Sequence, residues 1–394
     1  MKKIFIPSSI SNKHLSNFNK NQSLIICCFV FIMSLVFNPA SLSGQCAELT
    51  KTVKKAEKYF DEGNLERSVE LLEKTLSNRK FRTCWEEIKK ANVLLTQAYL
   101  FMNKDSLATK SYDDVLYADP MYKADSSLES IDLVYFARRF HTVPRLTLTF
   151  AASLNSHSFL NQIVSTENIN GTGMINNNFD GNANNKTVYS NYTGAGIGLR
   201  LGFHITTWLE IAAGVNYRNS GFKLEKTLYT SNSDDLTSLI SNEKINITER
   251  HQWIDIPVTL RINLSTKSWV PVIFFGGEYN QLLYAKFINS SRGGYTSNLI
   301  IDVLEQRQAS QYGWIAGLAF KYRPSSTIKD FLTINMKYYQ GLKLINDPNN
   351  KYANSTLYLD LGYVDDDIYI GYFEVSVGYS LTRYRTLHNK QRFR

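Results

Sequence analysis

Beyond its first 45 residues, the chain lacks any apolar run that reaches the ~20 residues a helix needs to cross a bilayer. Its one long apolar run, residues 24–37, follows a basic segment without acidic residues and precedes Pro39 and several small residues. This is the pattern of a cleaved export signal. We therefore predict a signal peptide at residues 1–45, with a retained anchor as the alternative. Any later entry into a membrane would require strands closed into a barrel.

The chain also lacks a strong charge of one sign and the motifs of common catalytic sites. Removing the four lysines of the predicted signal lowers the formal charge from +9 to +5, and the remaining basic residues are scattered. This argues against a nucleic-acid partner. No phosphate-binding glycine loop, nucleophile elbow or metal-spaced Cys/His cluster occurs in the sequence. We predict no cofactor, no metal site and no enzymatic activity.

Cysteine is scarce, and two of the four cysteines fall in the predicted signal. The mature chain would keep Cys46 and Cys84, which can form a disulfide in an oxidising compartment. Lipidation of Cys46, or two free thiols, are the alternatives.

Residues 46–140 have the apolar spacing of helices. The pattern favours two helical hairpins, the first turning at Gly63 and the second ending at Pro120, followed by a last helix over 126–140. It looks like a short tetratricopeptide-like (TPR-like) array, which would offer a groove to a protein partner. The alternative is an ordinary helical bundle without a partner.

After Pro144, apolar and polar residues alternate with a period of two, as in β-strands. The clearest segment is 195–205, where Ile197, Leu199 and Leu201 alternate with glycines and Arg200. Seven more segments follow this pattern or have high β-propensity: 145–154, 209–218, 254–264, 270–284, 313–322, 332–338 and 373–381. A soluble sandwich would bury the apolar face, whereas a membrane barrel turns it towards lipid.

Strand number and loop length favour the barrel. Eight strands is an even number, as closure of an antiparallel barrel requires. Short turns are predicted at 206–207, 265–268 and 323–329, and long polar loops at 156–191, 219–249, 287–310 and 345–367. Short periplasmic turns and long external loops are typical of bacterial outer-membrane barrels. We predict an α + β multidomain chain: a periplasmic helical module, an eight-stranded antiparallel transmembrane barrel at 144–386, and a basic tail at 387–394.

The interior of such a barrel is just wide enough for its own side chains, and buried charges need partners. We therefore predict a plugged lumen. The inward-facing charges expected to form an ion-pair network are Arg145, Arg200, Arg218, Arg261, Lys321, Lys337, Glu210, Asp255, Glu278 and Glu374. His204 is interpreted as an interior residue. The acidic run 365–367 is interpreted as a solvated loop tip, with a cation site as the alternative.

Two short stretches carry a family resemblance. Residues 253–258, Trp-Ile-Asp-Ile-Pro-Val, precede the Pro–aromatic–Gly strand at 270–277. This pair resembles the PorT-like outer-membrane β-barrel family common in Bacteroidota. The join at 137–144 resembles the link between a periplasmic repeat module and a barrel in proteins of that phylum. The resemblance implies the barrel fold and no particular function.

These observations predict a non-enzymatic outer-membrane protein. Its barrel would contact outer-membrane lipid, and residues 47–140 would bind or organise a periplasmic or envelope protein. A transport or secretion accessory role is the first alternative. A lipid-modifying enzyme is the second, and His157, between Ser156 and Ser158, is its one candidate residue.

Overall fold

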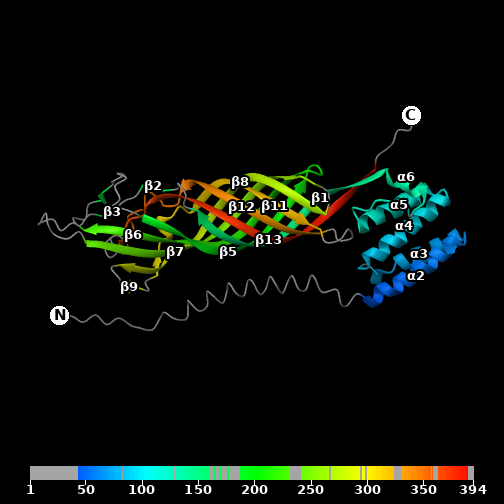
Figure 1. Ribbon diagram of the computed structural model, residues 1–394, viewed down its shortest axis with the longest axis horizontal. Helices are drawn as coiled ribbons and strands as arrows, with labels where there is room; N and C mark the ends of the chain where they lie inside the picture. Colours follow the sequence, from blue (N-terminus) through cyan, green and yellow to red (C-terminus); the bar gives the residue numbers. More distant parts are fainter. Residues whose placement is uncertain are drawn as a thin grey trace, which may run out of the picture.

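A helical module and a β-barrel lie end to end along the long axis of the molecule (Figure 1). The computed structural model describes residues 43–81, 83–127, 129–158, 163–165, 168–169, 175–176, 187–230, 241–265, 268–292, 295–297, 300–323, 330–355, 357 and 363–388. The predicted signal peptide, apart from residues 43–45, and residues 389–394 of the predicted tail lie outside this range. No helix in the described residues is long and apolar enough to cross a membrane.

The module contains five α-helices within the described residues. They are α2 (Ser43–Asp61), α3 (Leu65–Leu76), α4 (Trp85–Phe101), α5 (Asp105–Ala118) and α6 (Ile131–Ala137), with a short 3₁₀ turn at Arg79–Phe81. The predicted turn at Gly63 has φ +80°, and Asn103 has φ +53° between α4 and α5. Glycine and asparagine tolerate this left-handed conformation. The chain therefore reverses direction at Gly63 and at Asn103, and each pair of helices forms an antiparallel hairpin. The last helix is much shorter than the predicted 126–140.

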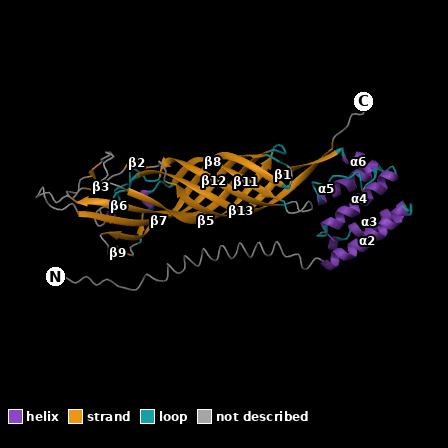
Figure 2. Ribbon diagram, in the orientation of Figure 1, coloured by secondary structure: helices purple, strands orange, loops and turns teal. Residues whose placement is uncertain are grey.

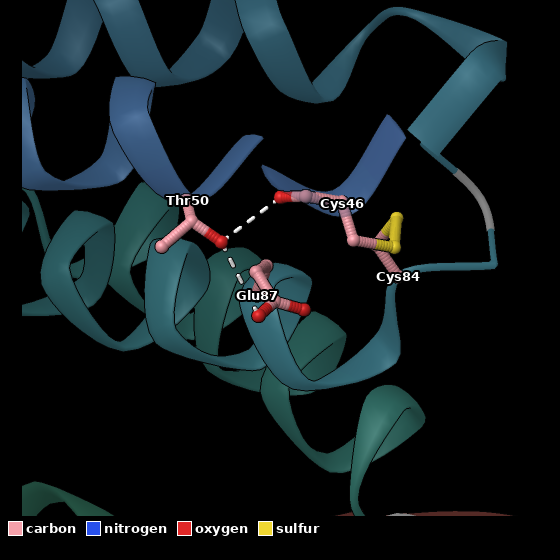
Figure 3. Close-up of a disulfide and its surroundings, with 4 residues drawn as sticks. All are labelled: Cys46, Thr50, Cys84 and Glu87. Atoms are coloured by element: carbon pink, nitrogen blue, oxygen red, sulfur yellow. Dashed lines mark hydrogen bonds between the residues drawn. A yellow bond between two sulfur atoms is a disulfide. The ribbon is translucent and has the colours of Figure 1, made fainter. Parts of the chain in front are cut away.

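A disulfide between Cys46 and Cys84 joins the first helix to the start of α4 (Figure 3). The two cysteines are 38 positions apart in the sequence, so the bridge encloses α3 and the 3₁₀ turn. Thr50 lies beside it and donates a hydrogen bond to the Cys46 carbonyl at 2.9 Å. Cys84 is buried in a core that also contains Leu49 and Leu72. The bridge therefore anchors the N-terminal helix to the module core.

Eight long antiparallel strands form the barrel wall, and the first pairs with the last to close the ring (Figure 2). In sheet order they are β1 (Phe140–Ser158), β5 (Thr187–His204), β6 (Leu209–Thr230), β7 (Ser241–Asn263), β8 (Trp269–Arg292), β11 (Ser310–Tyr322), β12 (Phe331–Leu344) and β13 (Asp367–His388). Short strands β2 (Ile163–Ser165), β9 (Tyr295–Ser297) and β10 (Ile301–Asp302) add to β13 and β8, and β3 (Asn168–Ile169) pairs with β4 (Ile175–Asn176). The predicted eight-stranded antiparallel ring is confirmed.

The part of the barrel nearest the module has an exposed apolar surface. Its residues are Leu146, Phe150, Leu154, Ile197, Leu199, Leu201, Phe203, Ile205, Ile211, Val215, Ile256, Val258, Leu264, Ile273, Phe275, Leu318, Phe320, Ile334, Met336, Val375, Val377 and Leu381. We call this surface the apolar belt. Exposed Trp208 and Trp269 lie at its module end, and Tyr279, Trp314 and Phe373 lie at the distal end. Apolar segments of about 9–11 residues bordered by aromatic side chains have the dimensions and pattern of a membrane-facing barrel wall.

Beyond the belt the strands continue, which corrects the loops predicted at 219–249 and 287–310. The hairpin β6–β7 extends to Thr230 and resumes at Ser241, and β8 runs to Arg292. Side chains continue to alternate between the inside and the outside of the barrel. The inward-facing residues, which are mostly polar in the belt, are mostly apolar here, as at Phe222 and Leu224. Apolar residues face out in the belt and inward beyond it, as in a water-soluble protein. This distal part is therefore built to stand in water.

Candidate functional site

Charged side chains fill the barrel interior at the level of the belt. Near the module end, the Lys321 Nζ lies 2.7 Å from the Glu210 Oε2, and the Arg261 Nε lies 3.9 Å from Glu210 Oε1. Arg200 donates to the Asn335 Oδ1 at 3.4 Å, and Arg261 does so at 3.1 Å. A Cβ at Gly202 would overlap the Glu210 carboxylate, so glycine on β5 makes room for this group.

A second charge cluster lies further along the interior. Arg218 forms a two-pronged contact with Asp255, at 2.7 and 3.1 Å. Lys337 lies 2.9 Å from Glu278 and 3.3 Å from Glu374. All of these side chains except Glu374 are at least nine-tenths buried, and that of Glu374 is 11 % exposed. The interior at this level is thus occupied by paired side chains.

Arg145 does not join these clusters, which corrects its predicted place in the lumen. The β1–β13 register shifts between Pro144 and Leu146, so Arg145 is the extra residue of a bulge. A bulge interrupts the alternation of side chains. Arg145 is exposed as a result. Asn335, which accepts from two arginines, was missed, although its inward position between Thr333 and Lys337 on β12 could have indicated it.

The distal part of the barrel has an apolar core with two buried ion clusters. We call it the distal core; it consists of Phe222, Leu224, Ile245, Ile247, Trp253, Leu282, Ala285, Phe287, Ile301, Val303, Ile315, Tyr339, Ile345, Leu357, Tyr363, Ile368, Ile370 and Tyr372. The Arg307 guanidinium donates two hydrogen bonds to the Glu249 carboxylate, at 2.6 and 2.9 Å, and two to the Asp365 carboxylate, at 2.7 and 2.9 Å. Lys226 donates to Asp366 at 2.7 Å and to a backbone carbonyl.

These contacts correct the interpretation of the acidic run 365–367 as a solvated loop tip. Asp365 and Asp366 are buried, and Asp367 lies 3.0 Å from Lys351. Each carboxylate has a basic partner, Arg307, Lys226 or Lys351, so the run is not available as a cation site. Across the described residues, no group of His, Cys, Asp and Glu is placed to hold a metal ion.

His157, the candidate residue for lipid-modifying chemistry, lies inside the barrel and not at an exposed rim. Its side chain is 1 % exposed, with the rings of Phe222, His251 and Tyr372 around it at 6.1–6.4 Å. A histidine enclosed in this way does not meet a substrate at the surface.

The module is attached to the barrel where β1 begins and β13 ends. Phe140 pairs with His388 across these strands, and its ring lies 4.8 Å from both Tyr112 and His388. His388 also lies 3.3 Å from Asp113 on α5, and Thr142 donates to the Pro120 carbonyl. Burial raises the pKa of Asp113, and the neighbouring His388 acts in the opposite direction. We call this contact the junction.

A cavity of about 660 Å³ lies at the junction, between the module and the end of the barrel interior. Its floor is the barrel end, with the polar side chains Thr147, His204, Asn263, Lys321 and Thr382. Its roof comes from α5, α6 and the segment between them, with the apolar side chains Leu116, Met121, Val134 and Ala137 and the ring of Tyr122. Pockets of 300–1,000 Å³ are the usual size for small-molecule sites.

Solved structures similar to this chain are outer-membrane β-barrel proteins. OprG from Pseudomonas aeruginosa is 10% identical over 61% of this chain and 98% of its own, with a TM-score of 0.31. Neisserial surface protein A (NspA) is 11% identical, covering 60% and 97%, with a TM-score of 0.28. Ail, the attachment invasion locus protein of Yersinia pestis, is 8% identical, covering 61% and 99%, with a TM-score of 0.27. No protein-family model and no curated protein matches the sequence.

Proposed function

We propose that this chain is a non-enzymatic outer-membrane protein whose barrel anchors a periplasmic helical module, and that the module binds or organises an envelope protein. The observation that carries the proposal is the apolar belt on a closed ring, which would be unstable in water unless lipid covered it. The belt ends at the level where the inward-facing side chains become apolar, so the distal part of the barrel would lie in the external medium. The resemblance to the PorT-like family of Bacteroidota is part of this proposal.

The packing of the interior favours an anchor over a channel. Paired charges occupy the belt level, and the distal core closes the other end among the described residues. The cavity at belt level has a volume of only about 50 Å³, room for one or two water molecules. A solute path would require separating these buried ion pairs, and an uncompensated buried charge is strongly unfavourable.

The module supports a role in protein binding because its outer surface retains large apolar side chains. Tyr117, Ile131 and Tyr135 are 66, 68 and 61 % exposed. Trp85 packs against Tyr117 with ring centroids 6.1 Å apart. Exposed aromatic side chains of this kind are typical of protein interfaces. The two helical hairpins are consistent with a short TPR-like array, which we keep as a proposal.

Two measurements test the anchor and the module separately. The membrane fraction run on unheated and heated denaturing gels should show a heat-modifiable band in the outer membrane. A soluble, heat-insensitive band would refute the anchor. A photo-crosslinking residue at Tyr117 or Tyr135 should capture one defined envelope protein in living cells, whereas the same residue at exposed Lys58 on α2 should not. Equal capture at all three positions would refute a specific partner surface.

A further inference from the structure

We propose that the junction cavity binds a single-chain amphiphile with an anionic head group, its head beside the basic side chains of the lining and its chain on the apolar ones. The site does not depend on the partner proposed above. Its lining is mixed: the barrel end adds Val270 and Phe331 to its polar side chains, and the module adds Lys123, Ser126 and Arg138 to its apolar ones. A ligand that is polar throughout, or apolar throughout, would match only part of this lining.

The charge around the cavity favours an anion. Lys123, Arg138 and Lys321 line it together with His141 and His204, and none of the described lining residues is acidic. Glu210, which is not among the lining residues, contacts Lys321 at 2.7 Å and His204 at 3.7 Å, and it also faces Arg261. A negative head group would therefore meet basic side chains from both the barrel and the module.

The polar side chains of the floor are held in place by one another. The His204 Nε2 lies 2.9 Å from the Thr147 Oγ1 and 3.7 Å from the Glu210 Oε2. The Asn263 Oδ1 accepts from Lys321 at 3.1 Å. A head group would therefore meet a polar surface that is already ordered, which lowers the entropic cost of binding.

The apolar part of the site extends into the barrel. Val270 and Phe331 line the cavity and belong to an inward-facing apolar cluster with Val272, Phe274 and Ala319. In an interior otherwise filled with charges, this cluster gives the barrel side of the cavity an apolar surface. An acyl chain can therefore be covered on two sides.

Calorimetric titration of the full chain in amphipol tests the proposal, with decanoate as the probe and titration into empty amphipol subtracted. We expect saturable binding of decanoate and at least about tenfold weaker binding of decan-1-ol, because a charged hydrogen bond is lost. Decyl phosphate distinguishes the source of the head group: tighter binding than decanoate indicates a lysophospholipid-like ligand, and weaker binding a fatty acid. Equal affinity for decanoate and decan-1-ol would overturn the anionic head.

Two variants locate the site. Val134→Trp fills the roof and should weaken decanoate binding at least about tenfold, whereas Leu107→Trp, an exposed position on α5 outside the cavity, should leave it unchanged. Lys321→Gln should have an effect as large as that of Val134→Trp, with heat-modifiability on gels confirming a folded barrel. If Lys321→Gln does not fold, Val134→Trp still decides. Unchanged binding in Val134→Trp would overturn the proposed site.

Discussion

Breaking the Cys46–Cys84 bridge should destabilise the helical module and leave the barrel intact. A cross-link limits the freedom of the unfolded chain, and a loop of 38 positions corresponds to about 4 kcal/mol in the chain-entropy treatment. Measured effects of native disulfides are about 2–5 kcal/mol. For a domain the size of the module, 1 kcal/mol shifts the unfolding midpoint by about 4–8 °C, so we expect a fall of roughly 10–30 °C.

Thermal proteolysis of the full chain, with and without reductant, measures this midpoint for the module alone. The barrel has no cysteine, so its heat-modifiability on gels serves as an internal control. Cys46→Ala/Cys84→Ala should reproduce the reduced state and show no further response to reductant. Equal midpoints for the oxidised and reduced chains would show that the core around Leu49 and Leu72 holds the first helix without the bridge.

Three further predictions concern the barrel. Leu199→Arg, in the middle of the apolar belt, should lower the free energy of unfolding by about 2–4 kcal/mol in a urea-refolding assay in lipid. Val188→Arg is equally exposed but lies beyond the belt, and it should lower this free energy by less than about 0.5 kcal/mol. Equal losses would refute the position of the belt. Glu249 lies beyond the belt, and although burial opposes its ionisation, Arg307 and His251 lower its pKa to about 2. Because this lies below the unfolded value of about 4.3, the contribution of Glu249 to stability is complete above pH ~4.3 and is lost as the pH falls towards 2. Hydrogen-exchange protection factors at 245–251, which are corrected for the intrinsic pH dependence of amide exchange, should therefore be smaller at pH 3 than at pH 7. Equal protection factors at the two pH values would contradict this. Arg307→Met leaves two buried carboxylates without their arginine partner and should destabilise the distal core by about 3–5 kcal/mol. Adding Glu249→Gln and Asp365→Asn should recover part of this loss. An Arg307→Met variant as stable as the parent chain would refute the role of the cluster.

The strand pattern of the barrel could be predicted because alternation is a local signal. Ile197, Leu199 and Leu201 show the outward face within a few residues of sequence. The same rule failed at 219–249, where apolar residues move to the inward positions Phe222, Leu224, Ile245 and Ile247 while the strand geometry is unchanged. A strand that passes from lipid to water reverses its hydrophobic pattern, and polar outward residues then resemble those of a loop.

The site could be predicted only in part, because strand alternation gives the direction of a side chain and not its contacts with distant segments. Inward charges such as Glu210 and Lys321 followed from strand phase, and the structure places them 2.7 Å apart. Arg145 was misplaced because a bulge has no clear sequence signal. Arg307 and its partners come from segments 58 positions apart, so their contact depends on the folded topology. The junction cavity arises between two parts of the chain, and no local pattern encodes it.

The junction makes the position of the module depend on the completion of the barrel. Phe140 and His388 belong to the first and last strands of the ring, and both contact α5. These strands meet only when the ring closes, so the full docking surface for the module does not exist in an open or partly inserted sheet. A docked module therefore signals that assembly is finished, and a factor that recognises the docked arrangement would act on mature barrels alone.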